Sequence, residues 1–275
     1  MTKNKNRILH STYRHRKRFF IVILFFSCLS IFGNTVQDST EYTNSADKED
    51  IIIEKTKSFS YTKYIIPTAL ITYGIVTQFS EPLQNFDHSI HEKIKNKVSK
   101  KYAFDDYLQY ASPVAMYALN LSGVKSKHNL RDQTIILAST TLLTTITVQA
   151  TKLTTKIPRP DGGTNAFPSG HTATAFAGAH ILYKEYKDIS PWIGIGGYLS
   201  ATTVGAFRMI NKRHWFSDVI TGAGTGILCV EVSYLMLPVY HRLFGIDSNR
   251  KRNETVMVIP LIGRDFYGGG LAWRF

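Results

Sequence analysis

Apolar stretches of helical length alternate with short polar connections along most of the chain. Strands are shorter than these stretches and alternate with a period of two, so the pattern predicts α-helices. Six such helices with short connections would form an all-α bundle. The predicted helices cover residues 64–80, 107–124, 133–151, 172–183, 189–207 and 219–240. Residues 92–101 are densely charged and predict an exposed surface segment.

A polar segment precedes the predicted helices, and a segment with a strand-like pattern follows them. Residues 34–61 are polar and of mixed charge, which is typical of a linker. The helical bundle is therefore expected over residues 62–245, followed by a tail over residues 246–275. The tail alternates like a strand, with Tyr267 and Phe275 on the same parity. It predicts a short β-like extension, with a hairpin as one form.

Two interpretations fit this tail. It resembles the last strand of bacterial outer-membrane barrels, which also end in Phe, as this chain does at Phe275. One hairpin cannot close a barrel, however, and an open sheet edge is not stable in lipid. This argument favours a strand that packs on the bundle.

Residues 1–33 have the layout of a secretory signal peptide or an N-terminal anchor. Seven Lys and Arg residues precede the apolar run 19–32, and no acidic residue occurs before Asp38. The run is shorter than the roughly 20 residues that a spanning helix needs. A lipoprotein signal at Cys28 and a buried N-terminal helix of a cytosolic protein are the alternatives.

The charge and the cysteines narrow the class of protein. The net charge is +13, and about half of it lies in the N-terminal block. A nucleic-acid-binding domain would spread its basic residues over the fold, so that class is not expected. Cleavage of the signal would leave Cys229 as one thiol with no internal disulfide. No cluster of Asp and Glu offers a hard-metal site, so no metal or other cofactor is predicted.

The predicted helices fit a membrane bundle and a soluble bundle. Four of the runs approach the roughly 20 residues that a bilayer demands, but the run 172–183 does not. The mean hydropathy of −0.10 is low for six spans. Small residues at Gly222, Ala223, Gly224 and Gly226 suit close helix packing in either solvent.

The first group of polar residues with chemical potential stands where the Thr-rich helix ends. Lys152 is followed by Arg159, and Pro158 and Pro160 are expected to stop the helix. Arg is a bidentate fork for phosphate oxygens, and Lys is a point charge. Two cations on a rigid helix exit suit an oxyanion, although basic residues at helix ends also simply meet solvent or lipid headgroups.

The second group opens the next helix, after a turn at residues 161–163. Ser169 offers a hydroxyl group, Gly170 lets the backbone approach a ligand, and His171 follows. The N-terminus of a helix carries unpaired N–H groups and positive charge, which makes it an anion site. A Ser cap beside an incidental His is the alternative interpretation.

The third group links the last two predicted helices. Arg208 ends one helix, and His214 and Asp218 begin the next, four residues apart on one helical face. A carboxylate that holds one imidazole nitrogen leaves the other nitrogen free to attack an electrophile. A structural His–Asp cap would look the same. Three such groups in one chain are nevertheless hard to attribute to chance.

Together the three groups read K-x6-R-P, P-S-G-H and R-x5-H-x3-D, which resembles the signature of the type-2 phosphatidic acid phosphatase superfamily. This superfamily also contains bacterial class A acid phosphatases and vanadium haloperoxidases. The resemblance covers residues 62–245 in helix layout and residues 152–218 in motifs, and it implies a six-helix bundle. Phe207 stands where the family usually has Ser, which removes one phosphate contact.

The resemblance implies a metal-independent phosphatase and a role for each matching residue. His214 attacks phosphorus and becomes phosphohistidine, and Asp218 orients it. His171 protonates the leaving oxygen and then activates water. The phosphate group is bound by Lys152, Arg159, Ser169, Gly170 and Arg208.

A lipid phosphatase with a periplasmic site is the leading functional hypothesis. Its substrate would be a lipid A phosphate, undecaprenyl diphosphate or phosphatidylglycerol phosphate, and its partner would be a membrane rather than nucleic acid. The predicted address is the bacterial cell envelope, at the inner membrane or associated with a membrane, the outer membrane included. The oligomeric state is not predicted. The alternatives are a soluble broad-specificity periplasmic acid phosphatase, a vanadium haloperoxidase and a non-catalytic relic.

The topology restricts the leading hypothesis. An uncleaved anchor followed by three spans would place Lys152 on the cytoplasmic side. A periplasmic site therefore requires either a cleaved signal together with a bundle that does not fully span the membrane, or one apolar run that does not span.

Overall fold

The computed structural model describes residues 62–97, 103–246, 255–262 and 267–274 of the chain. These residues belong to two compact units, with the division between Leu237 and Pro238. The predicted signal or anchor at 1–33 and the predicted linker at 34–61 lie outside the described residues. The domain boundaries drawn from the sequence stay predictions.

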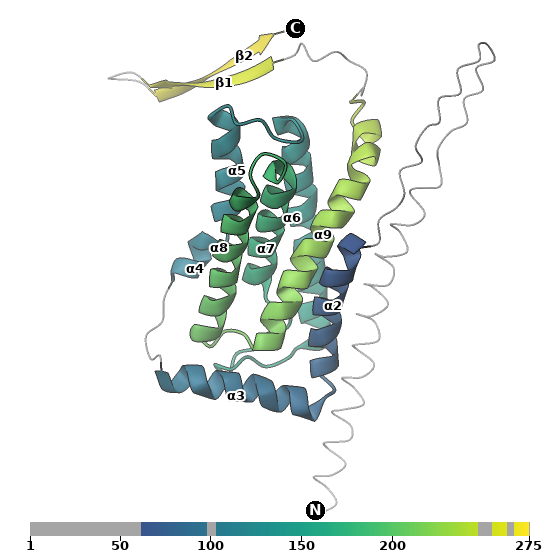
Figure 1. The fold of residues 1–275 in the computed structure, drawn as a ribbon, viewed down its shortest axis with the longest axis vertical. Helices are drawn as coiled ribbons and strands as arrows, with labels where there is room; N and C mark the ends of the chain where they lie inside the picture. The colour runs from purple at the N-terminus through teal and green to yellow at the C-terminus, as the bar shows by residue number, and fades with distance from the viewer. Residues whose placement is uncertain (1–61, 98–102, 247–254, 263–266, 275) are drawn as a thin grey trace, which may run out of the picture. The chain divides into compact units, whose positions relative to one another are not determined.

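Helices build the first unit, so the predicted all-α fold is confirmed (Figure 1). Each of the six predicted helices has a counterpart, and two further helices, α3 and α4, precede α5. The charged composition of α3 predicted an exposed segment without assigning it a helix, and α4 is too short to give a periodic pattern. The bounds are α2 (Thr62–Thr77), α3 (Glu81–Lys97), α4 (Phe104–Leu108), α5 (Ala111–Leu121), α6 (Leu130–Thr155), α7 (Gly170–Tyr186), α8 (Pro191–Ile210) and α9 (Phe216–Leu243).

The second unit contains an antiparallel hairpin, which confirms the predicted β-like extension. Its strands are β1 (Thr255–Ile262) and β2 (Tyr267–Arg274). The register pairs Thr255 with Arg274 at one end and Ile262 with Tyr267 at the other. Packing of this hairpin on the bundle stays a prediction.

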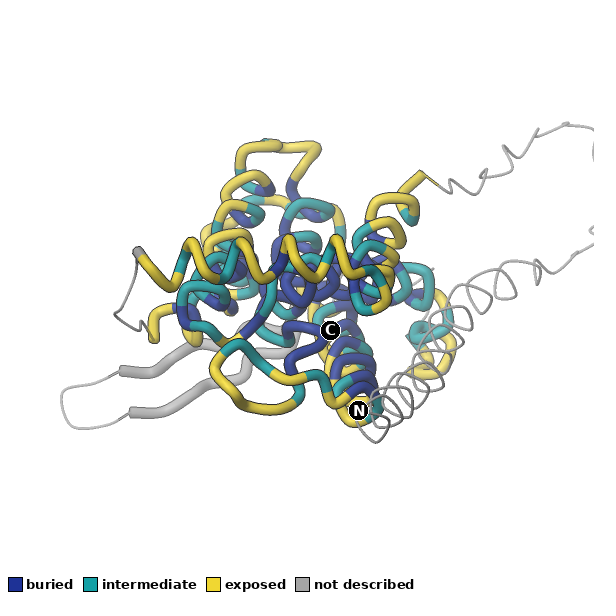
Figure 2. The backbone as a smooth tube through the Cα atoms, turned by 90° about the horizontal axis from the view of Figure 1, so that it is seen from below, coloured by how far each residue is buried: buried dark blue, intermediate teal, exposed yellow. Residues whose placement is uncertain are grey.

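The core of the first unit lies along α7, which contacts α5, α6 and α8. Small residues fill the middle of α7, and larger apolar residues cluster towards its C-terminal end. Figure 2 shows the buried segments gathered between the helices. The main cluster consists of Met116, Ile136, Ala177, Ile181, Leu182, Tyr186, Val230 and Leu237.

Glycines on α9 allow close contact with two neighbouring helices, as the sequence predicted for this stretch. A Cβ at Gly222 would lie 2.5 Å from the carbonyl oxygen of Ser169, and one at Gly224 would lie 2.7 Å from that of Pro67. Neither carbonyl belongs to a flexible side chain, so a larger residue would push the helices apart. The close approach at Gly222 places the start of α9 against the start of α7, where the backbone N–H of Ser169 donates to the carbonyl oxygen of Asp218 at 3.0 Å.

The predicted polar groups meet because four helix ends lie at one end of the bundle, the lower end in Figure 1. Helices α6 and α8 end there, and α7 and α9 begin there. Helix α6 continues to Thr155, four residues beyond the predicted end, and stops at Lys156 in the left-handed conformation (φ 52). The longer helix carries Lys152 on its last turn. Helix α3 crosses beneath this end.

Two of the described helices, α6 and α9, are long and apolar enough to cross a membrane by length and composition. The most apolar window of α9 is 72% buried and that of α6 is 33% buried, so α9 would also serve as the core helix of a soluble protein. Helix α5 has 11 residues, fewer than its predicted run, because a separate helix, α4, occupies the start of that run.

Candidate functional site

The structure brings all eight predicted site residues to the lower end of the bundle. The charges of Arg208, Lys152 and Arg159 all act on the ring of His214, although the three cations come from different parts of the chain. A Cβ added at Gly170 would lie 3.8 Å from Nζ of Lys152. The start of α7 therefore faces the last turn of α6, as the predicted phosphate site requires.

His214 lies in the turn before α9 and is 3% exposed. Burial holds its pKa well below the usual value of 6.5, and the charges of Arg208, Lys152 and Arg159 lower it further. A hydrogen bond to the backbone of Ala166 opposes this shift. The ring is therefore neutral near pH 7, with a lone pair available on one nitrogen.

Asp218 and His214 face each other but do not form a hydrogen bond in this structure. Oδ2 of Asp218 lies 3.6 Å from Nδ1 of His214, which is too long for a hydrogen bond. The same oxygen accepts the backbone N–H of Trp215 at 2.9 Å, so it also closes the turn that leads into α9. The spacing brings Asp218 near His214, but His214 stands just before the helix rather than on it, and the predicted hold of the carboxylate on the ring stays a prediction.

A short turn holds Arg159 towards the site. The backbone N–H of Arg159 donates to the carbonyl oxygen of Gly163 at 2.8 Å, and Oδ1 of Asp161 accepts the N–H of Gly163 at 3.0 Å. Gly162 adopts φ +87, which side chains other than glycine rarely adopt. The turn predicted at residues 161–163 is confirmed.

Ser169 occupies the N-cap position of α7 and is fully buried. Its hydroxyl group lies 2.8 Å from the hydroxyl group of Thr172 rather than over the backbone N–H groups of the helix. A hydroxyl group has one donor and two acceptor positions, and here its contact is with Thr172 instead of with the backbone of α7. The N–H groups of the first turn of α7 therefore do not receive a side-chain cap from Ser169, and they suit an anion.

Four buried polar atoms at this end lack a hydrogen-bond partner among the described residues. They are Nε of Arg159, Nε of Arg208, Nδ1 of His214 and Oδ1 of Asp218. Such atoms are rare in folded proteins, since each costs about 1–3 kcal/mol. Two guanidinium N–H donors without partners, beside a helix N-terminus, can bind a tetrahedral oxyanion.

Two acidic residues that the sequence analysis missed also belong to this end of the bundle. Asp105 and Asp106, on the short helix α4, are the acid pair of this site. Nη1 of Arg208 donates to Oδ2 of Asp105 at 2.7 Å and to Oδ1 of Asp106 at 3.3 Å. Nε2 of His171 lies 2.9 Å from the same oxygen of Asp106. Two consecutive acids directly before the uncharged run at 107–124 were the available signal.

The environment of His171 balances opposing charges. Burial lowers its pKa below 6.5, and the neighbouring charge of Arg208 adds to this effect. The carboxylates of Asp106 and Asp105 act in the opposite direction. His171 is thus held between a cation and the acid pair.

Helix α3 closes the lower end from below, a role that its charged sequence did not predict. Asp87 is buried and accepts hydrogen bonds from the hydroxyl group of Ser217 and, at 3.2 Å, from the backbone N–H of Ser217. Burial raises the pKa of Asp87, although these hydrogen bonds lower it. The ring of Trp215 packs edge-on against His88 and His91. These contacts fix the turn that carries His214.

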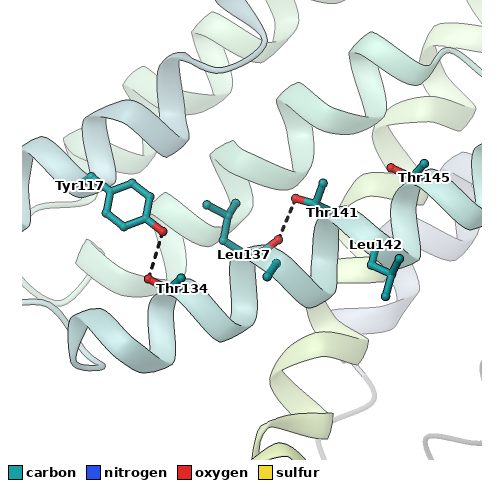
Figure 3. A pocket seen from close by; sticks show the side chains of 7 residues that line it. Tyr117, Thr134, Leu137, Thr141, Leu142 and Thr145 are labelled. Atoms are coloured by element: carbon teal, nitrogen blue, oxygen red, sulfur yellow. Dashed lines mark hydrogen bonds between the residues drawn. The ribbon is translucent and has the colours of Figure 1, made fainter.

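A groove of about 490 Å³ lies elsewhere, along α5 and α6 (Figure 3). Tyr117 and Thr134 are joined across it by a hydrogen bond of 3.1 Å between their hydroxyl groups. Its lining holds no predicted site residue and no charged side chain. The groove is therefore not the phosphate site.

Within the part of the chain that the structure describes, no group of three or more His, Cys, Asp or Glu side chains could hold a metal ion. The cations of Lys152, Arg159 and Arg208 are the positive charges that the chain itself supplies to the site. The metal independence of the reaction stays a prediction.

Comparison with known proteins finds similarities in the same region of the chain. Residues 133–242 match the sequence profile of the PAP2 superfamily. Over 109 residues the chain is 43% identical to a lipid A 1-phosphatase of Porphyromonas gingivalis. The match covers 38% of this chain and 24% of the relative, so the chain spans about a quarter of the relative's length.

Two solved structures are similar to the chain. The crystal structure of Aquifex aeolicus LpxE has a TM-score of 0.42 and 23% identity, and the match covers 53% of this chain and 93% of that chain. The PAP2-type phosphatidylglycerolphosphate phosphatase from Bacillus subtilis has a TM-score of 0.40 and 19% identity, over 67% of this chain and 99% of that chain.

Proposed function

We propose that the chain is a phosphatase of the PAP2 superfamily, the type-2 phosphatidic acid phosphatases, whose sequence profile residues 133–242 match, and that it hydrolyses phosphate esters or diphosphates of lipids. One observation carries the proposal. The charges of three cations from two motifs act on a buried neutral histidine, and two of these cations have buried N–H groups without partners among the described residues. Phosphoryl transfer requires this combination of positioning and charge neutralisation.

In the first step, the phosphoryl oxygens bind to Lys152, Arg159 and Arg208 and to the start of α7. We assign the proton of the neutral His214 ring to Nδ1, which lies 3.6 Å from Oδ2 of Asp218. The lone pair of Nε2 then attacks phosphorus, the bond from phosphorus to the lipid oxygen breaks, and phosphohistidine forms. Protonated His171 gives its proton to the departing oxygen.

In the second step, the roles of the histidines reverse. Neutral His171 takes a proton from a water molecule, and the resulting hydroxide attacks phosphorus. The bond to Nε2 of His214 breaks, phosphate leaves, and both rings return to their starting states. Asp218 stabilises the positive charge on His214 while phosphorus is attached. The three cations neutralise the charge that develops on the equatorial oxygens.

A lipid substrate is supported by two observations. The relative from P. gingivalis is named for its action on the 1-phosphate of lipid A. Helices α6 and α9 are apolar enough for membrane association. We place a lipid A phosphate first among the substrates, ahead of undecaprenyl diphosphate and phosphatidylglycerol phosphate. The proposed address is the bacterial cell envelope, with the site on the periplasmic side.

A soluble periplasmic acid phosphatase is the second candidate. The window of α9 that passes for a membrane span is 72% buried within the protein, as in a soluble core. Such an enzyme would be extracted by carbonate or high salt, whereas a membrane-embedded enzyme would need detergent.

The test is release of inorganic phosphate by the purified full chain in detergent, across a panel of lipid phosphates and soluble phosphate esters. His214→Ala is the blank, and His241→Ala is the matched control at the other end of α9. We expect release from at least one lipid phosphate, lost in the blank and kept in the control. Turnover of soluble esters alone would favour the second candidate, and activity in the blank would refute the assigned nucleophile.

A further inference from the structure

The acid pair on α4 brings negative charge to the proposed phosphate site, where the proposed chemistry does not require it. A site that binds phosphate oxygens is expected to exclude carboxylates, because like charges repel. The two acids nevertheless lie against Arg208 and His171. Their burial and their contacts differ, and this difference separates their roles.

Asp105 is the structural member of the acid pair. It is 1% exposed, and its two carboxylate oxygens accept from Nη1 of Arg208 at 2.7 Å and from Nδ2 of Asn211 at 3.1 Å. Both donors lie at the end of α8. Asp105 therefore fixes the guanidinium group while leaving Nε of Arg208 unpaired among the described residues.

Asp106 has a different position. Its side chain is 54% exposed, so burial does not force it to find a partner. One oxygen, Oδ1, nevertheless contacts both Nε2 of His171 and Nη1 of Arg208, at 2.9 Å and 3.3 Å. Holding an exposed carboxylate in these two contacts costs side-chain conformational entropy. The contacts of Asp106 are therefore not explained by the need to satisfy buried polar groups.

We propose that Asp106 is the positioning residue of His171, so that the site contains two His–carboxylate pairs, one for the nucleophile and one for the general acid. This inference rests on the proposed function. The carboxylate holds the N–H of His171 at Nε2, which fixes the tautomer and leaves Nδ1 as the nitrogen that exchanges protons with the reacting groups.

The proton balance follows from this arrangement. Protonated His171 carries one proton on each nitrogen, and the proton on Nδ1 passes to the departing lipid oxygen. The proton on Nε2 stays with Asp106 throughout. Nδ1 of the neutral ring then takes a proton from the attacking water. Asp106 itself neither gains nor loses a proton.

Several charged groups face His171 from the surrounding elements. Arg208 on α8 favours the neutral ring, and Asp105 and Asp106 on α4 favour the protonated ring. Lys152 on α6 and Asp218 on α9 lie at the adjacent start of α7. Among these groups, Asp106 is the one that bonds to the ring directly. Its removal should therefore make His171 a weaker base.

The first experiment compares Asp106→Asn with the wild-type full chain in steady-state phosphate release. We expect kcat to fall about tenfold, which is a part of the 10²–10⁴-fold effect of a general acid. KM should not rise, because a repulsive carboxylate has been removed from the phosphate site. The alkaline limb of kcat/KM should move to lower pH. Asp106→Glu should recover most of the activity, and Asp188→Asn, an exposed acid in the turn between α7 and α8, should match the wild type.

A double-mutant cycle separates a positioning role from a structural one. If Asp106 acts through His171, then Asp106→Asn should have almost no further effect on kcat in a His171→Gln background. Effects that multiply in the double variant would overturn the proposal. A rise in KM with an unchanged alkaline limb would also overturn it.

A measurement without turnover keeps this inference distinct from the proposed function. The pKa of His171 can be followed by the NMR shifts of labelled histidines, assigned with His171→Gln. We expect a lower pKa in Asp106→Asn than in the wild type, and equal values would overturn the inference whatever the activity. A wild-type protein that releases no phosphate but shows the expected pKa difference would refute the proposed function and leave the contact established.

Discussion

Replacement of Arg208 by Ala would separate the two tasks that this residue performs. Arg208 is 8% exposed, and Nη1 lies 2.7 Å from Oδ2 of Asp105, which is 1% exposed. The substitution removes a cation from the proposed phosphate site. It also leaves the carboxylate of Asp105 buried without its ion-pair partner. We therefore expect a loss of stability and a loss of activity from one change.

The size of the stability loss follows from the contacts of Asp105. Loss of one member of a buried ion pair costs about 3–5 kcal/mol. The amide of Asn211 still donates to Asp105 in the variant, so the lower end of this range applies. For a chain of this size, a loss of about 3 kcal/mol lowers Tm by roughly 6–12 °C. Removal of one oxyanion donor should lower kcat/KM by about 10²–10³.

The assay is thermal unfolding in detergent, followed by tryptophan fluorescence, beside phosphate release at a temperature where every variant is folded. The double variant Asp105→Asn, Arg208→Gln is the control, because it removes both charges and keeps hydrogen-bonding groups at both positions. We expect its Tm to recover most of the loss while its activity stays low. A wild-type Tm for Arg208→Ala would refute the buried ion pair, and restored activity in the double variant would refute the role of Arg208 in phosphate binding.

Four further outcomes are expected. The acid limb of the kcat/KM profile should lie below pH 6.5, because the lowered pKa of His214 keeps this nucleophile neutral until the pH falls below that pKa. An acid limb with its midpoint above pH 6.5, found with two substrates of different phosphate pKa, would contradict this. Gly170→Ala should fold with a wild-type Tm, since its Cβ meets Val148 at 3.5 Å, but should raise KM severalfold because that Cβ lies 3.8 Å from Nζ of Lys152. Gly222→Val should lower the unfolding free energy by about 1–3 kcal/mol, measured by denaturant or thermal unfolding, because its side chain meets the carbonyl oxygen of Ser169. Dialysis against EDTA should leave phosphate release unchanged, and recovery by added Mg²⁺ after a loss would contradict a metal-independent reaction.

The sequence predicted the bundle well because apolar runs record which segments need to be buried. It placed six of the eight described helices, and it located the close packing at residues 222–226. It missed α3 because the many charged residues of this helix obscure its one buried face in the pattern of apolar and polar positions. Asp87 occupies that face and is bonded to Ser217, a pairing across 130 positions of the chain that no local pattern contains.

The candidate site also contains residues that the sequence predicted and residues that it did not. Each motif was visible because its residues stand at helix ends, and a helix end is a local feature. The acid pair was not visible, because Asp106 and His171 are 65 positions apart and only the packing of α4 brings them together. The predicted stacking of His214 and Asp218 on one helical face was correct in spacing but not in detail, since His214 precedes α9 and its Nδ1 lies 3.6 Å from Oδ2 of Asp218.

The resting site is built around groups that do not satisfy one another, and the rest of the bundle must hold them in place. Nδ1 of His214 and Oδ1 of Asp218 have no hydrogen-bond partner among the described residues, and Nδ1 lies 3.6 Å from the other carboxylate oxygen, Oδ2. Binding of an anion to Nε of Arg159 and Nε of Arg208 would remove repulsion between the cations. Positive charge on His214 would then become favourable, and the contact with Asp218 could shorten as phosphohistidine forms. The glycine contacts of α9 and the contact of α3 with Ser217 resist the collapse of this arrangement without substrate. Under the proposed mechanism, the unsatisfied groups therefore represent binding energy that is reserved for the charged intermediate, and interactions of this kind raise kcat rather than only lowering KM.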